Sequence, residues 1–248
     1  MTHTLLPAFL QAIRTLNDSM PLTKEDLLSE DFLIQKVGEL EMYYSPHNEY
    51  INKKARIIIV GITPGWSQMK IAYEHFLKGF AAEKAMEVVL RETKIAAGFA
   101  GAMRANLMAM LDQCGIPESL HINGSSALFN EDRTLLHTTS VIKYPVFYRA
   151  KNYTGHQPGI FQSKLLTEYA TKVFAEEIGE IKKNALIIPL GKTAETIIRH
   201  LMEANKLAGH TILFGFPHPS GANGHRVRQF EEQKNSLAQT VRKWSDQI

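Results

Sequence analysis

Four short apolar runs along the chain predict buried β-strands. Each is rich in Ile, Val, Leu or Phe, is bounded by polar residues, Gly or Pro, and is too short for a buried helix. They cover residues 55–61, 137–144, 185–191 and 211–216. Amphipathic helical patterns occur at residues 102–114, 164–179 and 193–205, and a last helix places Val227, Phe230, Leu237, Val241 and Trp244 near one face. This alternation predicts an α/β fold with three layers, α/β/α, around a central four-stranded, mainly parallel sheet.

The N-terminal part of the chain is read as an extension of that fold. Residues 1–54 look like a helical extension packed on the sheet, and the segment PLTKEDLL places a helix start near Thr23. No linker-like change in composition divides the remainder. We therefore expect one domain over residues 1–248, with the extension as part of it.

The composition narrows the class of protein. Hydrophobic residues make up 44% of the chain and charged residues 21%, which is typical of a globular protein. The single cysteine, Cys114, excludes an internal disulfide, a cysteine-held zinc site and a four-cysteine iron–sulfur cluster. Arg14 interrupts the first apolar run, which lacks the features of a signal peptide, and no window reaches membrane-spanning length. We expect a cytoplasmic protein with no membrane partner and no cofactor.

The distribution of charge permits a nucleic-acid partner. The formal net charge is +3, and residues 133–163 contain no Asp or Glu. That stretch interleaves basic and aromatic side chains, namely Arg133, Lys143, Arg149 and Lys151 with Tyr144, Phe147, Tyr148, Tyr153 and Phe161. A second acid-free stretch covers residues 204–230. Such composition suits a phosphate backbone with unstacked bases, and a mildly basic, solvated loop fits it equally well.

Glycine, proline and polar residues gather where the predicted strands end. The strands run into GITPGWSQ, SVIKYPVFYRAKNYTG, PLGKTA and PHPSGANGHR, and ligands of open parallel sheets bind beyond the carboxyl ends of strands. PLGKTA is not a Walker phosphate loop, because Leu186 stands where that motif needs its first glycine; Gly191 is expected to make a tight strand-to-helix turn. His210, His218 and His225 have no carboxylate or cysteine nearby to complete a metal shell, so no metal site is expected.

Two of these turns resemble the signature motifs of a known family. GITPG after the first strand and HPS after the last are similar to the paired motifs of the uracil-DNA glycosylase superfamily. Between them, GFAGAMRANLMAMLDQCGI, HTTSVIKY and PLGKTA resemble family segments in the same order, so the resemblance covers roughly residues 43–230. It implies a uracil-DNA glycosylase-like α/β fold and an enzyme that hydrolyses the N-glycosidic bond of a base extruded from DNA.

The resemblance also assigns roles to residues. His218 would donate to the anionic base oxygen, and Thr63 would hold the attacking water. Ile62, Phe99 and Ser140 would bind the base, with the Phe99 ring stacked on it. The residues expected to bind DNA phosphates are Gly65, Lys143, Ser220, Gly221, Asn223 and Arg226.

Three positions depart from the family pattern. Ile62 stands where active members carry Asp, Asn or Glu, Ser140 replaces the base-reading Asn, and Ala222 replaces a bulky wedge. The primary hypothesis is therefore a monomeric glycosylase for uracil or another deaminated or damaged base, which favours single-stranded or mismatched DNA. The alternative is a divergent, non-catalytic member that binds nucleic acid or a nucleobase. A third hypothesis is an unrelated α/β enzyme whose Lys192 and Arg226 contact a nucleotide or sugar phosphate.

Overall fold

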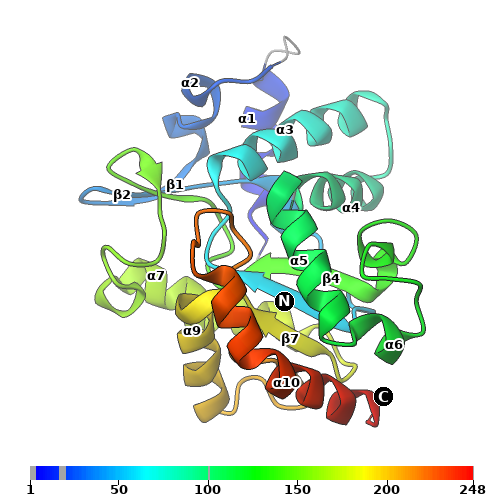
Figure 1. Ribbon diagram of the computed structural model, residues 1–248. Coiled ribbons are helices and arrows are strands. Elements are labelled where there is room, and N and C mark those ends of the chain that lie inside the picture. Colours follow the sequence, from blue (N-terminus) through cyan, green and yellow to red (C-terminus); the bar gives the residue numbers. More distant parts are fainter. Residues whose placement is uncertain (1–3, 17–20, 100, 248) are drawn as a thin grey trace. The chain divides into compact units, whose positions relative to one another are not determined.

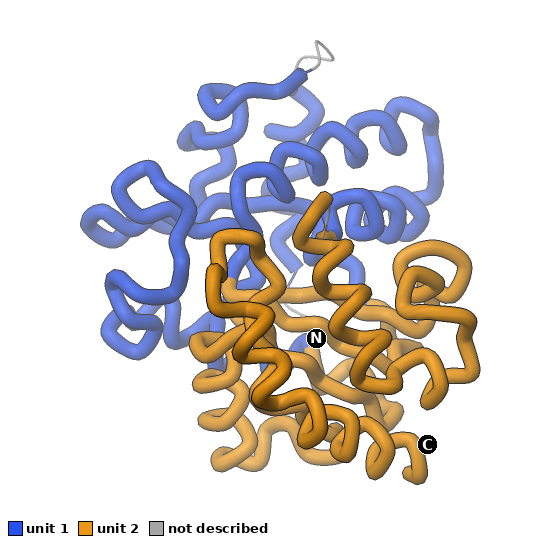
Figure 2. Tube along the Cα trace, viewed as in Figure 1, with its two compact units in different colours: residues 1–51, 63–98, 142–177 blue, residues 52–62, 99–141, 178–248 orange. Residues whose placement is uncertain are grey.

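The computed structural model describes residues 4–16, 21–99 and 101–247. The chain divides into two compact units (Figure 2). Unit 1 comprises residues 1–51, 63–98 and 142–177, and unit 2 comprises residues 52–62, 99–141 and 178–248. Each unit is assembled from three separate stretches of sequence. The expectation of a single domain stays a prediction.

Unit 2 contains the parallel sheet that the apolar runs predict. Its four strands are β3 (Ile57–Gly61), β4 (Leu136–Ser140), β7 (Leu186–Pro189) and β8 (Thr211–Ile212), in the order β4-β3-β7-β8 (Figure 1). All three neighbouring pairs are parallel, which confirms the α/β class. The central strand β3 is fully buried from Ile57 to Val60 and pairs along both edges, with β4 and with β7. β8 is shorter than predicted, and Gly215 turns the following chain with a φ of 84°.

The other regular elements of unit 2 are helical. They are α5 (Gly101–Gln113), α6 (Ile116–Leu120), α9 (Gly191–Glu203) and α10 (Arg226–Ser245), with short 3-10 turns at Ala127–Phe129 and Arg133–Leu135. Alternate strand residues such as Ile57 and Ile59 join one core cluster with Leu107 of α5 and Trp244 of α10. Cys114 is buried in the same cluster, and its burial raises the pKa of the thiol to about 12. The complete three-layer arrangement stays a prediction.

Unit 1 combines helices with an antiparallel sheet. The helices are α1 (Leu6–Thr15), α2 (Lys24–Leu27), α3 (Trp66–Ala81), α4 (Met86–Ala97), α7 (Lys164–Glu168) and the start of α8 (Phe174–Gly179), with 3-10 turns at Glu30–Phe32, Pro46–Glu49 and Ile160–Gln162 and a π-helical turn at Tyr169–Val173. The strands are β1 (Leu33–Val37), β2 (Leu40–Tyr43), β5 (Val146–Tyr148) and β6 (Lys151–Asn152), in the order β1-β2-β5-β6. Among the described residues, none of the helices combines the length and the apolar character needed to cross a membrane.

The N-terminal segment is not purely helical. The predicted start at Thr23 is present, since Thr23 Oγ1 accepts from Asp26 N at 3.4 Å while Asp26 Oδ2 accepts from Thr23 N at 2.7 Å. Residues 33–43, however, form β1 and β2, and β2 pairs with β5 from Met42 opposite Val146. A partner strand about a hundred residues away determines this ladder, and such pairing is invisible to local periodicity.

Candidate functional site

The carboxyl ends of β3 and β4 bring two predicted site residues together in unit 2. Gly61 lies opposite Ser140 in the parallel register, and Val141 N donates to Gly61 O at 3.0 Å. A Cβ placed on Gly61 would lie 3.5 Å from Ser140 Oγ. Ser140 is 8% exposed, and the half-buried Ile62 follows Gly61 directly. The first turn and the second strand therefore meet at one edge of the sheet, as the strand-end argument predicts.

The end of β7 adjoins the HPS turn at the same edge. Leu190 N donates to Val60 O at 2.9 Å, and Gly191 N donates to Phe216 O at 3.0 Å. Gly191 has a φ of 80°, and a Cβ there would lie 3.1 Å from the Cβ of His218. Both the left-handed backbone and this close approach require glycine. PLGKTA thus supports the position of His218 and makes no phosphate loop.

This contact gives a prediction with a matched control. Gly191→Ala and Gly209→Ala should each lower the free energy of unfolding by about 1–2 kcal/mol, because both positions have left-handed backbone. A Cβ on Gly209 meets no atom within 4 Å, so the Gly191 variant alone should displace His218. Urea unfolding measures the first effect and NMR shifts of the His218 ring the second. Equal losses with unchanged His218 shifts would contradict the close approach.

Hydrogen bonding and burial fix the chemical state of His218. Its Nδ1 accepts from Ser220 N at 3.2 Å, which assigns the ring proton to Nε2. Burial lowers the pKa of His218 below its ordinary value of 6.5, so the ring is neutral at neutral pH. The half-buried side chain therefore offers Nε2–H as a donor. A neutral donor of this kind stabilises negative charge that develops on an oxygen.

The predicted phosphate-binding residues of the HPSGANGHR turn form a network of their own. Ser220 Oγ accepts from Ala222 N at 3.2 Å, and Asn223 Nδ2 donates to His218 O at 3.2 Å. Arg226 donates from Nη1 to Ser220 O at 3.1 Å. A Cβ on Gly221 meets no atom within 4 Å, so the backbone there is open. These hydrogen bonds within the turn hold its shape.

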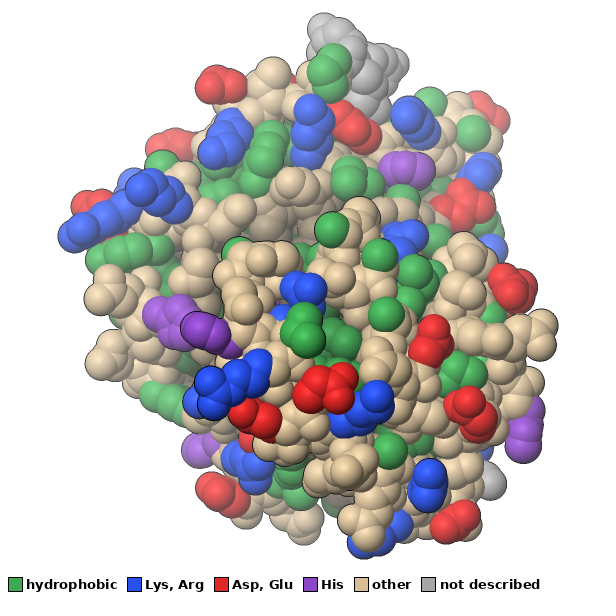
Figure 3. All heavy atoms as spheres, viewed as in Figure 1, with side chains coloured by type: hydrophobic (Ala, Val, Ile, Leu, Met, Phe, Trp, Pro, Cys, Tyr) green, Lys and Arg blue, Asp and Glu red, His purple; other side chains and the backbone are tan. Residues whose placement is uncertain are grey.

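The positive charge of Arg228, which follows this turn in α10, is partly neutralised. Arg228 Nε lies 2.8 Å from Glu232 Oε1 one helical turn later in α10. Basic and acidic side chains lie next to each other on the exposed surface of this helix (Figure 3). Arg226 is therefore the better placed of the two arginines to contact an anion at the turn.

Phe99 precedes helix α5, and this helix contacts the HPS turn through Asn106. Phe99 is partly buried and packs against the unit 2 core. Arg104 Nε donates to Phe99 O, and Asn106 Nδ2 donates to Pro219 O at 3.0 Å. Helix α5 thus connects the Phe99 segment to the HPS turn. Unit 2 contains Ile62, Phe99, Ser140 and His218 together with the predicted phosphate contacts of the turn.

The remaining predicted site residues, Thr63, Gly65 and Lys143, belong to unit 1. Thr63 Oγ1 donates to Tyr144 O at 2.8 Å and accepts from Val146 N at 3.2 Å. Its hydroxyl proton is therefore already used to hold the segment that precedes β5. Gly65 begins α3, and Trp66 N donates to Asn152 Oδ1 at 2.9 Å.

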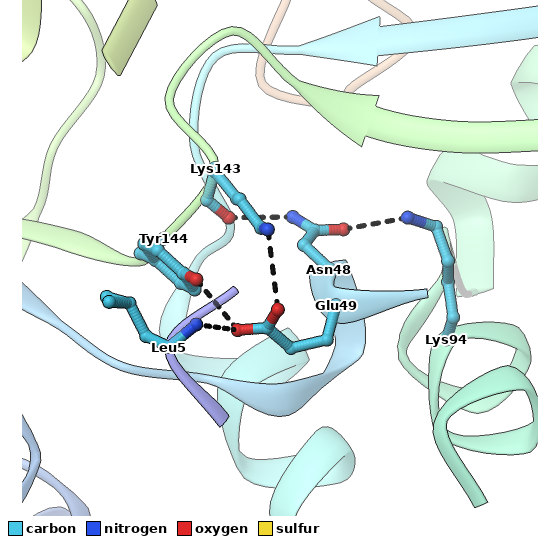
Figure 4. Close-up of polar contacts among 6 residues, drawn as sticks. All are labelled: Leu5, Asn48, Glu49, Lys94, Lys143 and Tyr144. Carbon is cyan, nitrogen blue, oxygen red and sulfur yellow. Dashed lines mark hydrogen bonds and ion pairs between the residues drawn. The ribbon is translucent and has the colours of Figure 1, made fainter. Parts of the chain in front are cut away.

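Lys143 does not fit the predicted phosphate contact. Its side chain is 2% exposed, and its Nζ lies 3.4 Å from Oε2 of Glu49, whose side chain is 1% exposed (Figure 4). Tyr144 Oη donates to Glu49 Oε1 at 2.7 Å, and Asn48 Nδ2 donates to Lys143 O at 2.8 Å. An ammonium buried in such a network is not presented to a DNA backbone. Local sequence patterns do not indicate this network, because Asn48 and Glu49 fall in the predicted extension.

His47 lies beside this network and titrates abnormally. Its Nδ1 is 2.9 Å from Ser45 Oγ, and the residue is 4% exposed. Burial, aided by the charge of Lys94, lowers the pKa of His47 from 6.5 to about 3. The unfolded chain retains the ordinary value. Below pH 6.5 the unfolded chain therefore takes up a proton that the folded chain does not bind.

A loss of stability on acidification follows from His47. The stability that depends on neutral His47 is fully present above pH 6.5. As the pH falls from 6.5 towards 3, the free energy of unfolding decreases by up to about 1.4 kcal/mol per pH unit. Urea unfolding near pH 7 and near pH 5 measures the slope. His47→Asn should remove this part of it, whereas the exposed His225→Asn should not. An unchanged slope in His47→Asn would refute the assignment.

Among the described residues, no group of three or more His, Cys, Asp and Glu side chains is arranged to hold a metal ion.

Comparison with known proteins identifies the family of this chain and one relative. The model of the Uracil DNA glycosylase superfamily matches residues 49–242, a range that contains both strand-end turns. The "Uncharacterized protein YoxB" of Bacillus subtilis (strain 168) is 47% identical over 245 residues, which cover 99% of this chain and 95% of that protein. No solved structure gives a significant match. Because this family model matches most of its length, the chain belongs to the uracil DNA glycosylase superfamily.

Proposed function

We propose that the protein is a DNA glycosylase that removes uracil or another deaminated or damaged base, and that it favours single-stranded or weakly paired DNA. The observation that carries this proposal is His218, a neutral Nε2–H donor at the carboxyl edge of the sheet that also ends in Ser140. Hydrolysis of an N-glycosidic bond leaves negative charge on the departing base. A donor aimed at that charge lowers the barrier, because it acts more strongly on the transition state than on the substrate.

The other residues of unit 2 support base binding. Ser140 supplies one hydroxyl beside Gly61, and Phe99 supplies an aromatic ring for stacking. A serine hydroxyl is a rotatable donor and acceptor, unlike the fixed pair of an Asn amide. We therefore expect weaker discrimination between uracil and other deaminated bases. Ala222 presents no bulky side chain, so duplex DNA should be a poorer substrate than a single strand.

The second candidate is a non-catalytic member of the family that binds nucleic acid or a nucleobase. One observation favours it. Ile62 has no polar group, and the Thr63 hydroxyl already donates to Tyr144 O and accepts from Val146 N. Neither residue supplies a general base for the attacking water. If this candidate is correct, the protein binds DNA in a salt-dependent manner and releases no base.

Base release separates the two candidates. Oligonucleotides that carry uracil, hypoxanthine or xanthine, single-stranded or mismatched, are incubated with enzyme in excess, and abasic sites are counted after alkaline cleavage. Release by the wild type, with loss in His218→Ala and retention in His225→Ala, supports the glycosylase. Binding without release from any substrate supports the second candidate and refutes the first. The monomeric state and the cytoplasmic location stay predictions.

A further inference from the structure

Two arginines of unit 2 share one aromatic ring. The guanidinium carbon of Arg104 lies 5.4 Å from the centroid of the Phe129 ring, and that of Arg133 lies 5.5 Å from the same centroid. Phe129 is 6% exposed, whereas both arginines are half-buried. A guanidinium that lies over an aromatic ring keeps its N–H edge available for hydrogen bonds in its own plane. The ring thus brings two cationic groups together.

The two positive charges have no carboxylate partner within the described part of the chain. Arg104 Nε donates to the neutral carbonyl of Phe99, and neither guanidinium forms a salt bridge there. Burial lowers the pKa of both residues, and the charge of Arg104 helps to bring the pKa of Arg133 to about 10. Both side chains are still protonated at neutral pH. Like charges held close together and partly desolvated raise the free energy of the protein unless an anion neutralises them.

The position of Arg104 in α5 adds to the positive potential. Arg104 lies at the end of the first turn of the helix, and that first turn contains no acidic residue. Cations are unfavourable there because the helix dipole places partial positive charge at this end. The same helix contacts Phe99 through Arg104 and the HPS turn through Asn106. An anion bound by the pair would therefore lie close to the Phe99 segment of the candidate site.

We propose that Arg104 and Arg133 form a phosphate-binding subsite that holds the sugar-phosphate backbone of the substrate strand beside the base-binding residues. This proposal rests on the proposed function, since it takes the bound polymer to be DNA. A phosphodiester suits the pair because the planar donor edges of two guanidiniums match its oxygens. Phe129 acts as a positioning residue, because its ring orients both groups.

The test compares salt-dependent binding of a fluorescent, single-stranded oligothymidylate. Arg104→Gln and Arg133→Gln should each weaken binding at low salt by about tenfold or more, the loss expected for a charged hydrogen bond. Each should also lower the slope of log affinity against log salt by about 0.7, the value for one phosphate contact on a single strand. Arg242→Gln is the matched control in the same unit, since Arg242 is exposed near the end of α10. It should leave both quantities unchanged.

Several outcomes separate this proposal from its alternatives. Arg104→Lys and Arg133→Lys keep the charge and the fold, and should recover the salt slope but only part of the affinity. Folded Gln variants that bind like Arg242→Gln overturn the subsite. Competition by inorganic phosphate at concentrations similar to those of the oligonucleotide indicates a free-anion site and also overturns it. If base release does not depend on either arginine, the proposed subsite is wrong and the proposed glycosylase function stands. If binding depends on the arginines but no base is released, the proposed glycosylase function is wrong and the subsite stands.

Discussion

Replacing His218 with Ala is expected to slow base release by about 10²–10³-fold, the loss measured when one donor to a developing oxyanion is removed. Affinity for the DNA strand should change little, because the donor acts mainly on charge that appears in the transition state. The effect should therefore fall on kcat and leave KM close to that of the wild type. Single-turnover release from uracil-containing single strands, with a parallel binding measurement, separates the two.

Two further variants sharpen the interpretation of His218. His218→Gln retains an N–H donor and should recover part of the rate, whereas a merely structural histidine would show no such recovery. His225→Ala removes an exposed histidine seven residues further along and should leave the rate of base release unchanged. A drop in affinity equal to the drop in rate would contradict a role confined to the transition state.

The pH dependence follows from the bond between Ser220 N and His218 Nδ1. When His218 takes up a second proton, Nδ1 becomes a donor that faces the Ser220 N–H, and the turn loses that bond. Because burial lowers the pKa of His218 below 6.5, this change occurs only in acid. Base release should therefore stay constant from about pH 8 down to the ordinary histidine pKa and decline below it.

The parts of the structure that local sequence determines were predictable. The four predicted runs overlap the parallel strands of unit 2. β3 and β7 consist mainly of Ile, Val and Leu, as burial on both faces favours, whereas β4 is the largely polar segment LHTTS. Thr23 and Asp26 formed the expected helix cap, which depends on a spacing of three residues. Gly191 made the expected tight turn, but its contact with His218 depends on a later loop and was not foreseen.

The parts that depend on partners distant in sequence were not predictable. Lys143 was expected to contact phosphate because it lies in a stretch of basic and aromatic residues without Asp or Glu, yet its partner Glu49 lies 94 residues earlier. Arg104 and Arg133 are brought together by Phe129, and no spacing rule connects the three. β1 and β2 owe their pairing to β5. Each case turns on tertiary contacts, which override the local pattern.

The second large effect is expected at the buried pair of Glu49 and Lys143. Glu49→Gln removes the carboxylate charge next to a buried ammonium and should lower the free energy of unfolding by about 3–5 kcal/mol. Lys143→Met should cost less, since Glu49 retains Tyr144 Oη and Leu5 N as donors at 2.7 and 3.1 Å. The carboxylate thus keeps two hydrogen-bond donors when the lysine is removed.

A double-mutant cycle measured by urea unfolding tests this coupling. In Glu49→Gln with Lys143→Met no net charge is left in the pair, so the double variant should be more stable than the sum of the single losses predicts. The control is Lys36→Met at the Lys36–Glu41 pair, which is shorter at 2.6 Å but has side chains 57% and 23% exposed. Solvent screens that pair, so its loss should be small despite the shorter distance. Burial, rather than distance, should therefore decide how much each pair contributes to the free energy of unfolding. Strictly additive losses in the Glu49 and Lys143 variants would show that the two charges do not stabilise each other.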